Sequence, residues 1–253
     1  MLLTPGQKIS ARQTPPPAQM VVGPAVAGTI DDMNDTWVVV PLFNEEEVIG
    51  DVVRDLRGTF PQVVCVDDGS QDGSSAEARA AGAVVVRHSL NLGQGASLQT
   101  GIHYALSDPR TRFVVTFDAD GQHQVSDAVA MVERLRAGAA DVIFGSRFLD
   151  SRTRPGGIKR LVLKAAVLHS NATTGVHLTD AHNGLRALNR QFCEQLNIRQ
   201  NRMAHASEIV GQVGRSQARV VEHPVHILYT DYSRSKGQSV LNSVNIVAEL
   251  FFK

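Results

Sequence analysis

The chain has 253 residues, of which 43% are hydrophobic and 20% are charged. This balance excludes a globally disordered chain and suits one large α/β domain or two small ones. Lys plus Arg and Asp plus Glu each number 25, so no bulk charge draws the chain to nucleic acid or to an anionic membrane. Any anion site must therefore come from a local cluster of residues.

The first 36 residues contain half of the ten prolines. Their apolar stretches are short and broken by proline, unlike those of a signal peptide. No apolar run in the chain approaches the roughly 20 residues of a membrane span. We predict residues 1–36 to be a disordered, proline-rich leader. The alternative is an arm that docks on the rest of the chain.

Short apolar segments alternate with amphipathic segments from Trp37 onward. In residues 44–58 the apolar side chains fall on one helical face, with Asn44 placed to cap the helix and Gly58 to end it. Continuous apolar strands that alternate with helices predict a mostly parallel α/β sheet covered on both faces. The predicted strands are 37–43, 62–66, 83–88, 112–117 and 140–145, and the predicted helices are 44–58, 74–82, 95–107 and 125–138.

The pattern is less regular after Gly145, which predicts a smaller, mixed C-terminal part. Pro224 favours an edge position for the last predicted strand. Residues 239–253 carry apolar side chains at helical spacing, which indicates core packing or an amphipathic helix at a membrane surface. The predicted elements here are helices over 157–175 and 203–216 and strands over 183–189 and 218–229.

The cysteines and one pair of histidines do not indicate a metal centre. Cys65 and Cys193 lack the spacing of a metal or redox motif. Cys65 lies in a predicted core strand, so we expect a buried free thiol in a reducing compartment. His223 and His226 lie three apart on a predicted strand and would point to opposite faces.

Polar residues follow each of the first five predicted strands. Ligands of an open α/β sheet bind beyond the carboxyl ends of its strands. Five clusters along one edge therefore describe a site. They are PLFNEE, DDGSQDG, NLGQG, DADGQH and SRF, at residues 41–46, 67–73, 91–95, 118–123 and 146–148.

The glycine fingerprints of dinucleotide and P-loop sites are absent after these strands. The NLGQG segment comes nearest and predicts a turn that opens a helix. Asp118 and Asp120 offer another way to meet phosphate charge, because Mg²⁺ is commonly held by one or two carboxylates plus substrate phosphates. Gln122 adds a carbonyl oxygen to this set. Taken alone, the two acids are also compatible with a solvated turn.

Four segments carry a resemblance: VVVPLFNEEEVIGDVV, VVCVDDGSQDGS, FVVTFDADGQHQ and VIFGSRF. In this order they resemble the family-2 glycosyltransferases, which have the GT-A (Rossmann-like) fold. The later LTDAHNGLRALNR resembles the subgroup of polyprenyl-phosphate (dolichyl-phosphate) sugar synthases. The resemblance implies a GT-A domain over 37–240, with a nucleotide-sugar half at 37–148, an acceptor half at 149–240 and a separate amphipathic helix at 238–253.

The resemblance implies roles for residues on the donor side. Pro41, Phe43 and Glu45 match positions that hold the nucleotide base and ribose. Val66 and Asp68 match positions on the second strand that contact the nucleoside.

The acid pair has its own counterpart in the family. Asp118, Ala119 and Asp120 match the diphosphate and metal motif, and Gln122 stands at its third metal position. This implies a Mg²⁺ or Mn²⁺ cofactor. Asp118, Asp120 and Arg147 are the catalytic residues that we predict.

On the acceptor side, Arg147 and Lys236 match basic positions that face the donor diphosphate and the acceptor phosphate. The family usually has an arginine about six residues before this lysine; here Tyr229 and Thr230 stand there, and Arg234 is the neighbouring substitute. The basic residues expected to bind the diphosphate or the acceptor are Arg147, Lys159, Arg160, Arg186, Arg234 and Lys236.

The chemistry of the transfer agrees with these residue types. Displacing a nucleoside diphosphate builds negative charge on the leaving phosphate, which a divalent ion and cationic side chains stabilise. A phosphate monoester has a second pKa of about 6 and is a dianion near neutral pH. It therefore needs cations to position it more than a base to activate it. Direct displacement implies inversion at the anomeric carbon.

We predict a metal-dependent, inverting glycosyltransferase that moves a sugar from a nucleotide to polyprenyl phosphate for cell-envelope glycan synthesis. The later segments look most like actinobacterial members of the subgroup, which implies a UDP-N-acetylhexosamine donor such as UDP-N-acetylgalactosamine. GDP-mannose and UDP-glucose stay open. The expected location is the cytoplasmic face of the cell membrane, with peripheral contact through the tail helix or a membrane-protein partner.

Two other functions stay open from the sequence. A transferase acting on a sugar hydroxyl would need a carboxylate base such as Glu208 or Asp180. With a phosphate acceptor, Glu208 is expected to have a packing role and Asp180 to order the floor of the site. The second alternative is a nucleotide-sugar-binding protein without turnover.

Overall fold

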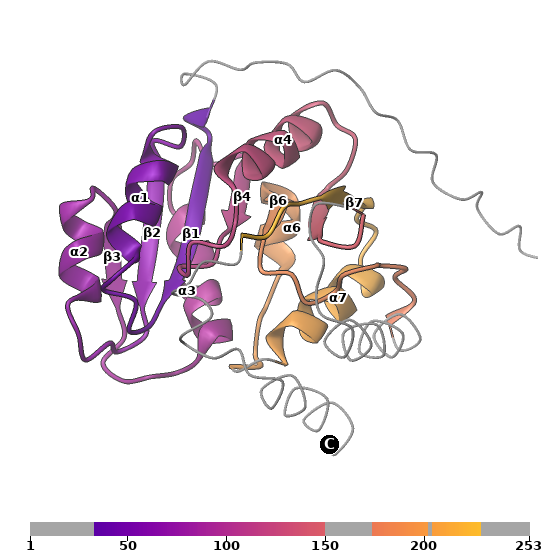
Figure 1. The fold of residues 1–253 in the computed structure, drawn as a ribbon. Helices are drawn as coiled ribbons and strands as arrows, with labels where there is room; N and C mark the ends of the chain where they lie inside the picture. The colour runs from indigo at the N-terminus through magenta and orange to yellow at the C-terminus, as the bar shows by residue number, and fades with distance from the viewer. Residues whose placement is uncertain (1–32, 150–173, 202–203, 229–253) are drawn as a thin grey trace, which may run out of the picture.

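The computed structural model describes residues 33–149, 174–201 and 204–228. Its elements form a seven-stranded sheet with helices on both faces (Figure 1). The strands are β1 (Thr36–Leu42), β2 (Gln62–Asp67), β3 (Val84–Arg87), β4 (Phe113–Thr116), β5 (Val142–Ser146), β6 (Arg186–Asn189) and β7 (Val220–Pro224). The helices are α1 (Ile49–Arg57), α2 (Ser74–Ala80), α3 (Gln94–Leu106), α4 (Val125–Arg136), α6 (Arg190–Gln195) and α7 (His205–Arg215).

The strands lie in the order β3-β2-β1-β4-β6-β5-β7. Neighbouring strands are parallel except where β6 pairs antiparallel with both β4 and β5. The predicted mostly parallel sheet is confirmed, and β7 is an edge strand as Pro224 indicated. Because β6 runs the other way, its first residue lies at the edge where the parallel strands end. This edge therefore collects the segments that follow β1, β2, β3, β4, β5 and β7, together with the start of β6.

Side chains of each strand alternate between two cores, one on each face of the sheet. On β1, Val38 and Val40 pack in the core that contains residues of α1, α2 and α4. Trp37 and Val39 pack in the core that contains residues of α3, α6 and α7. Gly101 lets α3 lie close to the sheet, because a Cβ at this position would collide with Val39 Cγ1. The molecule is thus a three-layer α/β/α arrangement.

The first predicted helix begins later than expected. It starts at Ile49, and Asn44 does not cap it. Asn44 instead has a φ of 52°, in the left-handed region that asparagine tolerates. Its Oδ1 accepts a hydrogen bond from the backbone N–H of Gln71 at 2.9 Å. The residue therefore joins the loop after β1 to the loop after β2.

The folded domain includes the last residues of the predicted leader. Met33 is only 2% exposed and lies in the core. Asp35 pairs with Arg136 at 2.8 Å and with Arg112 at 3.4 Å. Residues 1–32 and the predicted helices over 157–175 and 239–253 lie outside the described residues, apart from the end of the first helix at 174–175.

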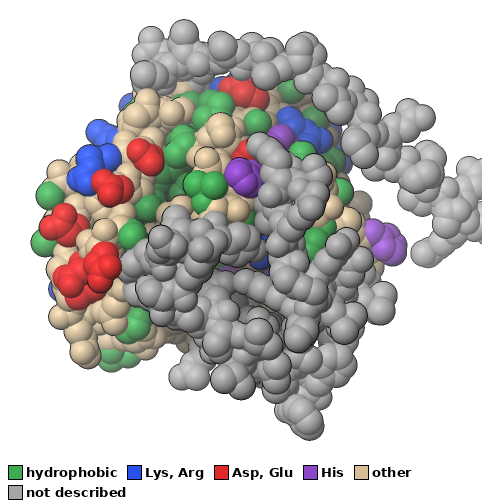
Figure 2. Space-filling model, in the orientation of Figure 1, with side chains coloured by type: hydrophobic (Ala, Val, Ile, Leu, Met, Phe, Trp, Pro, Cys, Tyr) green, Lys and Arg blue, Asp and Glu red, His purple; other side chains and the backbone are tan. Residues whose placement is uncertain are grey.

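Acidic and basic side chains lie near one another on the visible surface. The acidic ones gather on the side of α1 and α2, with basic ones beside them (Figure 2). Among the described helices, none has the length and apolar character needed to cross a membrane. Cys65 is a buried free thiol as predicted, Cys193 is one as well, and burial raises the pKa of Cys65 to about 12.

Candidate active site

The loops that follow β1 and β2 are fastened to each other at the carboxyl edge of the sheet. Ser70 Oγ accepts from the N–H of Asn44 at 3.0 Å, and Ser74 Oγ accepts from the N–H of Glu45 at 2.7 Å. Asp67 supports this arrangement by accepting from the N–H of Ser70 at 2.8 Å. The first two loops of the site thus form one unit.

Asp118 lies two residues beyond β4 and is held by three separate segments. Its Oδ2 contacts His123 Nε2 at 2.9 Å, and its Oδ1 accepts from Gln94 Nε2, at the start of α3, at 3.2 Å. Gly184 lies against the same carboxylate: a Cβ there would be 2.5 Å from Asp118 Cγ and closer still to both oxygens. A side chain at residue 184 would therefore displace Asp118.

These supporting residues were not among the predicted site residues. Gln94, His123 and Gly184 all lie in segments that the motifs above include. Their functional meaning depends on contacts between loops, which residue spacing does not reveal. The available signal was Gly184 itself, a glycine near the start of the predicted strand 183–189 and two residues before β6.

The two carboxyl groups of the acid pair have different environments. Burial favours a raised pKa for Asp118, but the hydrogen bond with His123 and the charges of His123, Arg186 and His205 hold that pKa below its ordinary value. Burial and the charge of Asp118 raise the pKa of Asp120 to about 6. Without a cation, Asp118 is thus the ionised partner and Asp120 the one that takes up a proton.

Charged side chains of opposite sign continue from Asp118 across β6 to β5. Arg186 interacts electrostatically with both Asp118 and Asp180. It is 1% exposed and lies over the Phe144 ring at 5.8 Å. Burial lowers the pKa of Arg186 to about 10, so it stays a cation near neutral pH. Asp180 Oδ2 accepts from Arg147 Nε at 2.6 Å and from the N–H of Arg147 at 3.1 Å.

The acid pair fits a divalent cation. No group of three or more His, Cys, Asp or Glu side chains capable of holding a metal occurs in the described ranges. Mg²⁺ does not need one, because it keeps waters and substrate phosphates beside one or two carboxylates. The electrostatic coupling between Asp118 and Asp120 shows that the carboxylates are close to each other. Their repulsion is the kind that a cation relieves.

The residues predicted to contact the nucleoside differ in accessibility. Phe43 is 44% exposed at the end of β1, and Pro41 is partly exposed. Glu45 is close enough to Asp120 to raise its pKa. Val66 is fully buried and packs in the core with α3. The Val66 side chain therefore faces the core rather than the edge of the sheet, and a contact between residue 66 and the nucleoside stays a prediction.

Asp68 has its carboxylate occupied by the chain itself. Its oxygens accept from the N–H groups of Leu92 at 2.9 Å and Gly93 at 2.6 Å, and contact His88 Nδ1 at 2.8 Å. The side chain is nearly buried. In this structure Asp68 fixes the loop after β3 rather than presenting a free carboxylate.

The predicted acceptor residues are only partly described. Arg147 and Arg186 both interact with Asp180, and Arg186 also interacts with Asp118 of the acid pair. Ala119 is nearly buried between the two acids. Lys159, Arg160, Arg234 and Lys236 lie outside the described residues.

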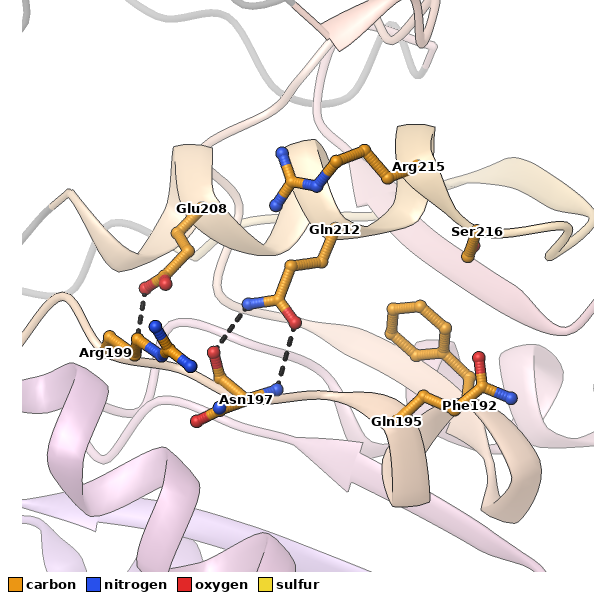
Figure 3. Close-up of a pocket in the computed structure, with 8 residues that line it drawn as sticks. All are labelled: Phe192, Gln195, Asn197, Arg199, Glu208, Gln212, Arg215 and Ser216. Carbon is orange, nitrogen blue, oxygen red and sulfur yellow. Dashed lines mark hydrogen bonds between the residues drawn. The ribbon is translucent and has the colours of Figure 1, made fainter.

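Glu208 lies on α7, and its carboxylate accepts hydrogen bonds from backbone N–H groups. Its Oε2 accepts from the N–H of Arg199 at 2.9 Å (Figure 3). The same oxygen accepts from the N–H of Gln200 at 2.7 Å. It lines a cleft of about 390 Å³ between α6, α7 and the segment that joins them. Glu208 is the only predicted or alternative site residue in the lining of this cleft, which contains Phe192, Gln195, Asn197, Arg199, Glu208, Gln212, Arg215 and Ser216.

The three-layer α/β/α arrangement, with an acid pair beyond β4, defines an α/β enzyme with the GT-A fold. The sequence matches glycosyl transferase family 2 over residues 37–196, and the chain belongs to this family. It is therefore a glycosyltransferase.

Two relatives show the range of proteins that the chain resembles. It is 26% identical over 240 residues to the UDP-N-acetylglucosamine–dolichyl-phosphate N-acetylglucosaminyltransferase of Methanococcus voltae, covering 85% of this chain and 94% of the relative. It is 31% identical over 180 residues to the polyprenol monophosphomannose synthase of Mycolicibacterium smegmatis, covering 67% of each chain.

A solved structure supports the fold. Glucosyl-3-phosphoglycerate synthase from Mycobacterium tuberculosis, in complex with Mn²⁺, UDP-glucose and phosphoglyceric acid, superposes with a TM-score of 0.63. The match covers 89% of this chain and 84% of that chain at 18% identity. At this identity the likeness concerns the fold alone.

Proposed function

We propose that the chain transfers a sugar from a nucleotide donor to a polyprenyl phosphate, with inversion and with a divalent cation. The observation that carries this proposal is the line of charges from Asp120 through Asp118, Arg186 and Asp180 to Arg147. A cation held by Asp118 and Asp120 would lie near Arg186, and Arg147 pairs with Asp180, the second acid that interacts with Arg186. Such a site suits two phosphate groups, one on the donor and one on the acceptor.

On the donor side, Asp118, Asp120 and Gln122 would hold Mg²⁺ or Mn²⁺. A bound cation neutralises charge that develops on the leaving nucleoside diphosphate. Gln94 and His123 keep the Asp118 carboxylate in one orientation. Preorganised groups of this kind stabilise a transition state without rearranging during the reaction. Phe43 and the loop held by Asp68 would contact the nucleoside.

On the acceptor side, Arg147 and the predicted cations Lys159, Arg160, Arg234 and Lys236 would position a phosphate dianion. Such an acceptor needs no general base. Glu208, the alternative base, already accepts two backbone N–H groups, which favours a phosphate over a hydroxyl acceptor. The two relatives bear names of enzymes that act with dolichyl phosphate or polyprenol phosphate.

We propose a UDP-N-acetylhexosamine as the donor, with N-acetylgalactosamine as the first candidate sugar. The named sugars of the two relatives differ, one being N-acetylglucosamine and the other mannose. Peripheral contact with the cytoplasmic membrane face belongs to the same proposal, because the lipid acceptor resides in a membrane.

The test is an incubation of the protein with membranes, Mg²⁺ or Mn²⁺ and radiolabelled nucleotide sugars. The expected product is extractable into organic solvent and labile to mild acid, and its label identifies the sugar. Asp120→Ala should abolish this product. Label found only in water-soluble glycan would contradict the proposed acceptor.

A further inference from the structure

Buried polar atoms without a hydrogen-bond partner concentrate in residues 180–186. Within the described part of the chain, eight such side-chain atoms occur. Five belong to this segment: Asp180 Oδ1, both ring nitrogens of His182, Asn183 Nδ2 and Arg186 Nε. A sixth, His123 Nδ1, belongs to the side chain that holds Asp118. Buried polar groups in folded proteins are nearly always paired, so this concentration indicates a place for a ligand.

The hydrogen-bonding character of these atoms can be assigned. Asn183 Oδ1 accepts from the N–H of Leu185 at 2.9 Å, which fixes the amide and leaves Nδ2 as a donor. Asp180 Oδ2 accepts two hydrogen bonds from Arg147. Asp180 Oδ1 has no partner and can accept a hydrogen bond from a ligand. Burial lowers the pKa of His182, so its neutral ring offers one donor and one acceptor. The set therefore contains donors and acceptors together.

The mixture of donors and acceptors indicates what kind of ligand these residues would bind. A phosphate only accepts hydrogen bonds near neutral pH and would be repelled by Asp180. The hydroxyl groups of a sugar both donate and accept. A polyhydroxyl group thus matches the set better than an anion does.

The segment also lies where the sugar of a nucleotide donor must be. Gly184 lies against the Asp118 carboxylate, and Arg186 interacts with both Asp118 and Asp180. The transferred sugar is bonded to the terminal phosphate of the nucleotide. If Asp118 helps to hold that phosphate through a cation, the sugar lies within a few bonds of residues 180–186.

We propose that Asp180, His182 and Asn183 bind the hydroxyl groups of the transferred sugar and thereby contribute to donor selectivity. This inference rests on the proposed function only in taking a nucleotide sugar as the donor. His182 is partly exposed, although both of its ring nitrogens are buried. Asp180 then has two roles, since one oxygen orients Arg147 and the other meets the sugar.

The test compares the nucleotide with and without its sugar. Calorimetry with Mg²⁺ measures binding of UDP, UDP-N-acetylgalactosamine, UDP-N-acetylglucosamine, UDP-glucose, GDP and GDP-mannose to the wild type, His182→Phe and His182→Gln. His182→Phe keeps an aromatic ring of similar size and removes both polar atoms. It should bind UDP or GDP within about twofold of the wild type but bind the preferred sugar nucleotide about tenfold more weakly, as loss of buried hydrogen bonds predicts. His182→Gln, which keeps a donor and an acceptor, should recover part of the loss.

The matched control is His177→Phe, an exposed histidine five residues earlier in the same connection. It should change no affinity. Thermal unfolding of each variant separates a folding defect from a binding defect. Equal weakening of nucleotide and sugar nucleotide by His182→Phe, no weakening of either, or no binding of any donor by the wild type would overturn the inference.

Donor binding requires no acceptor, so the two proposals fail in different ways. A wild type that transfers no sugar to polyprenyl phosphate, while His182→Phe selectively loses sugar-nucleotide affinity, contradicts the proposed acceptor and leaves the sugar site standing. If the wild type transfers sugar to polyprenyl phosphate and His182→Phe has unchanged donor affinities, the proposed acceptor stands and the sugar site is contradicted.

Discussion

Asp118 depends on residues that are distant from it in sequence. Gln94 reaches it from α3, and Gly184 reaches it from the residues before β6. Metal-binding carboxylates are usually oriented by such outer contacts, whose loss lowers metal affinity or activity by about 10- to 100-fold. The geometry of the acid pair is therefore a property of three loops rather than of the DAD motif alone.

Gly184→Ala should inactivate the enzyme without unfolding it completely. The added Cβ would overlap the Asp118 carboxylate, and a displacement of about 1 Å at a catalytic group can cost on the order of 100-fold in rate. Steady-state transfer assays and Mn²⁺ binding measure the effect. Gly50→Ala is the control, since the nearest atoms to its added Cβ belong to the flexible Arg54 side chain at 3.3 Å. Wild-type kinetics in Gly184→Ala would show that Asp118 is not constrained there.

Asp120 gives the metal-free protein a specific pH dependence. Its pKa rises from 3.8 to about 6 on folding, because of burial and the charge of Asp118. Between these values the native state binds more protons than the unfolded state, so the free energy of unfolding falls as pH rises from about 4 to 6. Above about pH 6 both Asp118 and Asp120 are ionised, and the free energy of unfolding no longer changes through Asp120.

Asp120→Asn should remove this loss of stability. In the presence of EDTA, the variant should exceed the wild type at pH 7 by on the order of 2 kcal/mol and by much less at pH 4. Urea unfolding across this range measures the difference. Mg²⁺ should raise the wild-type midpoint more at pH 7 than at pH 5 and have little effect on the variant. Asp51→Asn, on the exposed face of α1, serves as the control; equal slopes in wild type and Asp120→Asn would contradict the prediction.

At the scale of elements, the segment between α6 and α7 is held by two side chains of α7. Glu208 holds the N–H groups of Arg199 and Gln200, and Gln212 holds both backbone groups of Asn197. The segment in turn closes over the start of α3, where Gly95 N–H donates to Asn201 O at 2.9 Å. Glu208 therefore has an architectural role in this structure.

Glu208→Gln should keep most of the transferase activity. The amide oxygen still accepts a hydrogen bond, so we expect kcat within about threefold of the wild type and a loss of roughly 1 kcal/mol in the free energy of unfolding. Transfer assays and urea unfolding measure the two quantities. Gln212→Glu tests the other fastening residue in the same way. A loss of 100-fold or more in kcat, with Tm unchanged, would instead favour a general base and a hydroxyl acceptor.

At the scale of the whole molecule, the sheet separates two cores that each contain one cysteine. Cys65 belongs to the core with α1, α2 and α4, and Cys193 to the core with α3, α6 and α7. Both thiols are fully buried, and burial raises the pKa of each. Neither should react with a thiol reagent unless its side of the sheet opens.

The native protein should therefore show almost no labelling by a thiol reagent at pH 8. If the domain unfolds as one unit, Cys65 and Cys193 should become labelled with the same dependence on denaturant. Mass spectrometry of peptides after pulse labelling distinguishes the two sites. Cys193→Ser and Cys65→Ala provide single-thiol controls. Labelling of one cysteine well before the other would mean that the two layers open separately.

Much of the fold could be predicted because its signals are local. The apolar runs of β1, β2, β4 and β5 and the amphipathic stretches between them identify a parallel α/β sheet, and polar residues mark the strand ends. The Asn44 cap was wrong because an asparagine before an acidic turn fits both a cap and a left-handed loop position. The burial of the Val66 side chain could not be read from the motif, because a motif match does not show which face of a strand is covered.

The sequence by itself thus determined the class of fold, the edge that carries the site and the acid pair that occupies it. These depend on residue type and spacing along the chain. Only the tertiary structure decided that β6 enters antiparallel between β4 and β5 and so places Gly184 and Arg186 beside Asp118. Strand order depends on how distant segments share a core, and that information is spread over both faces of the sheet rather than held in any one motif.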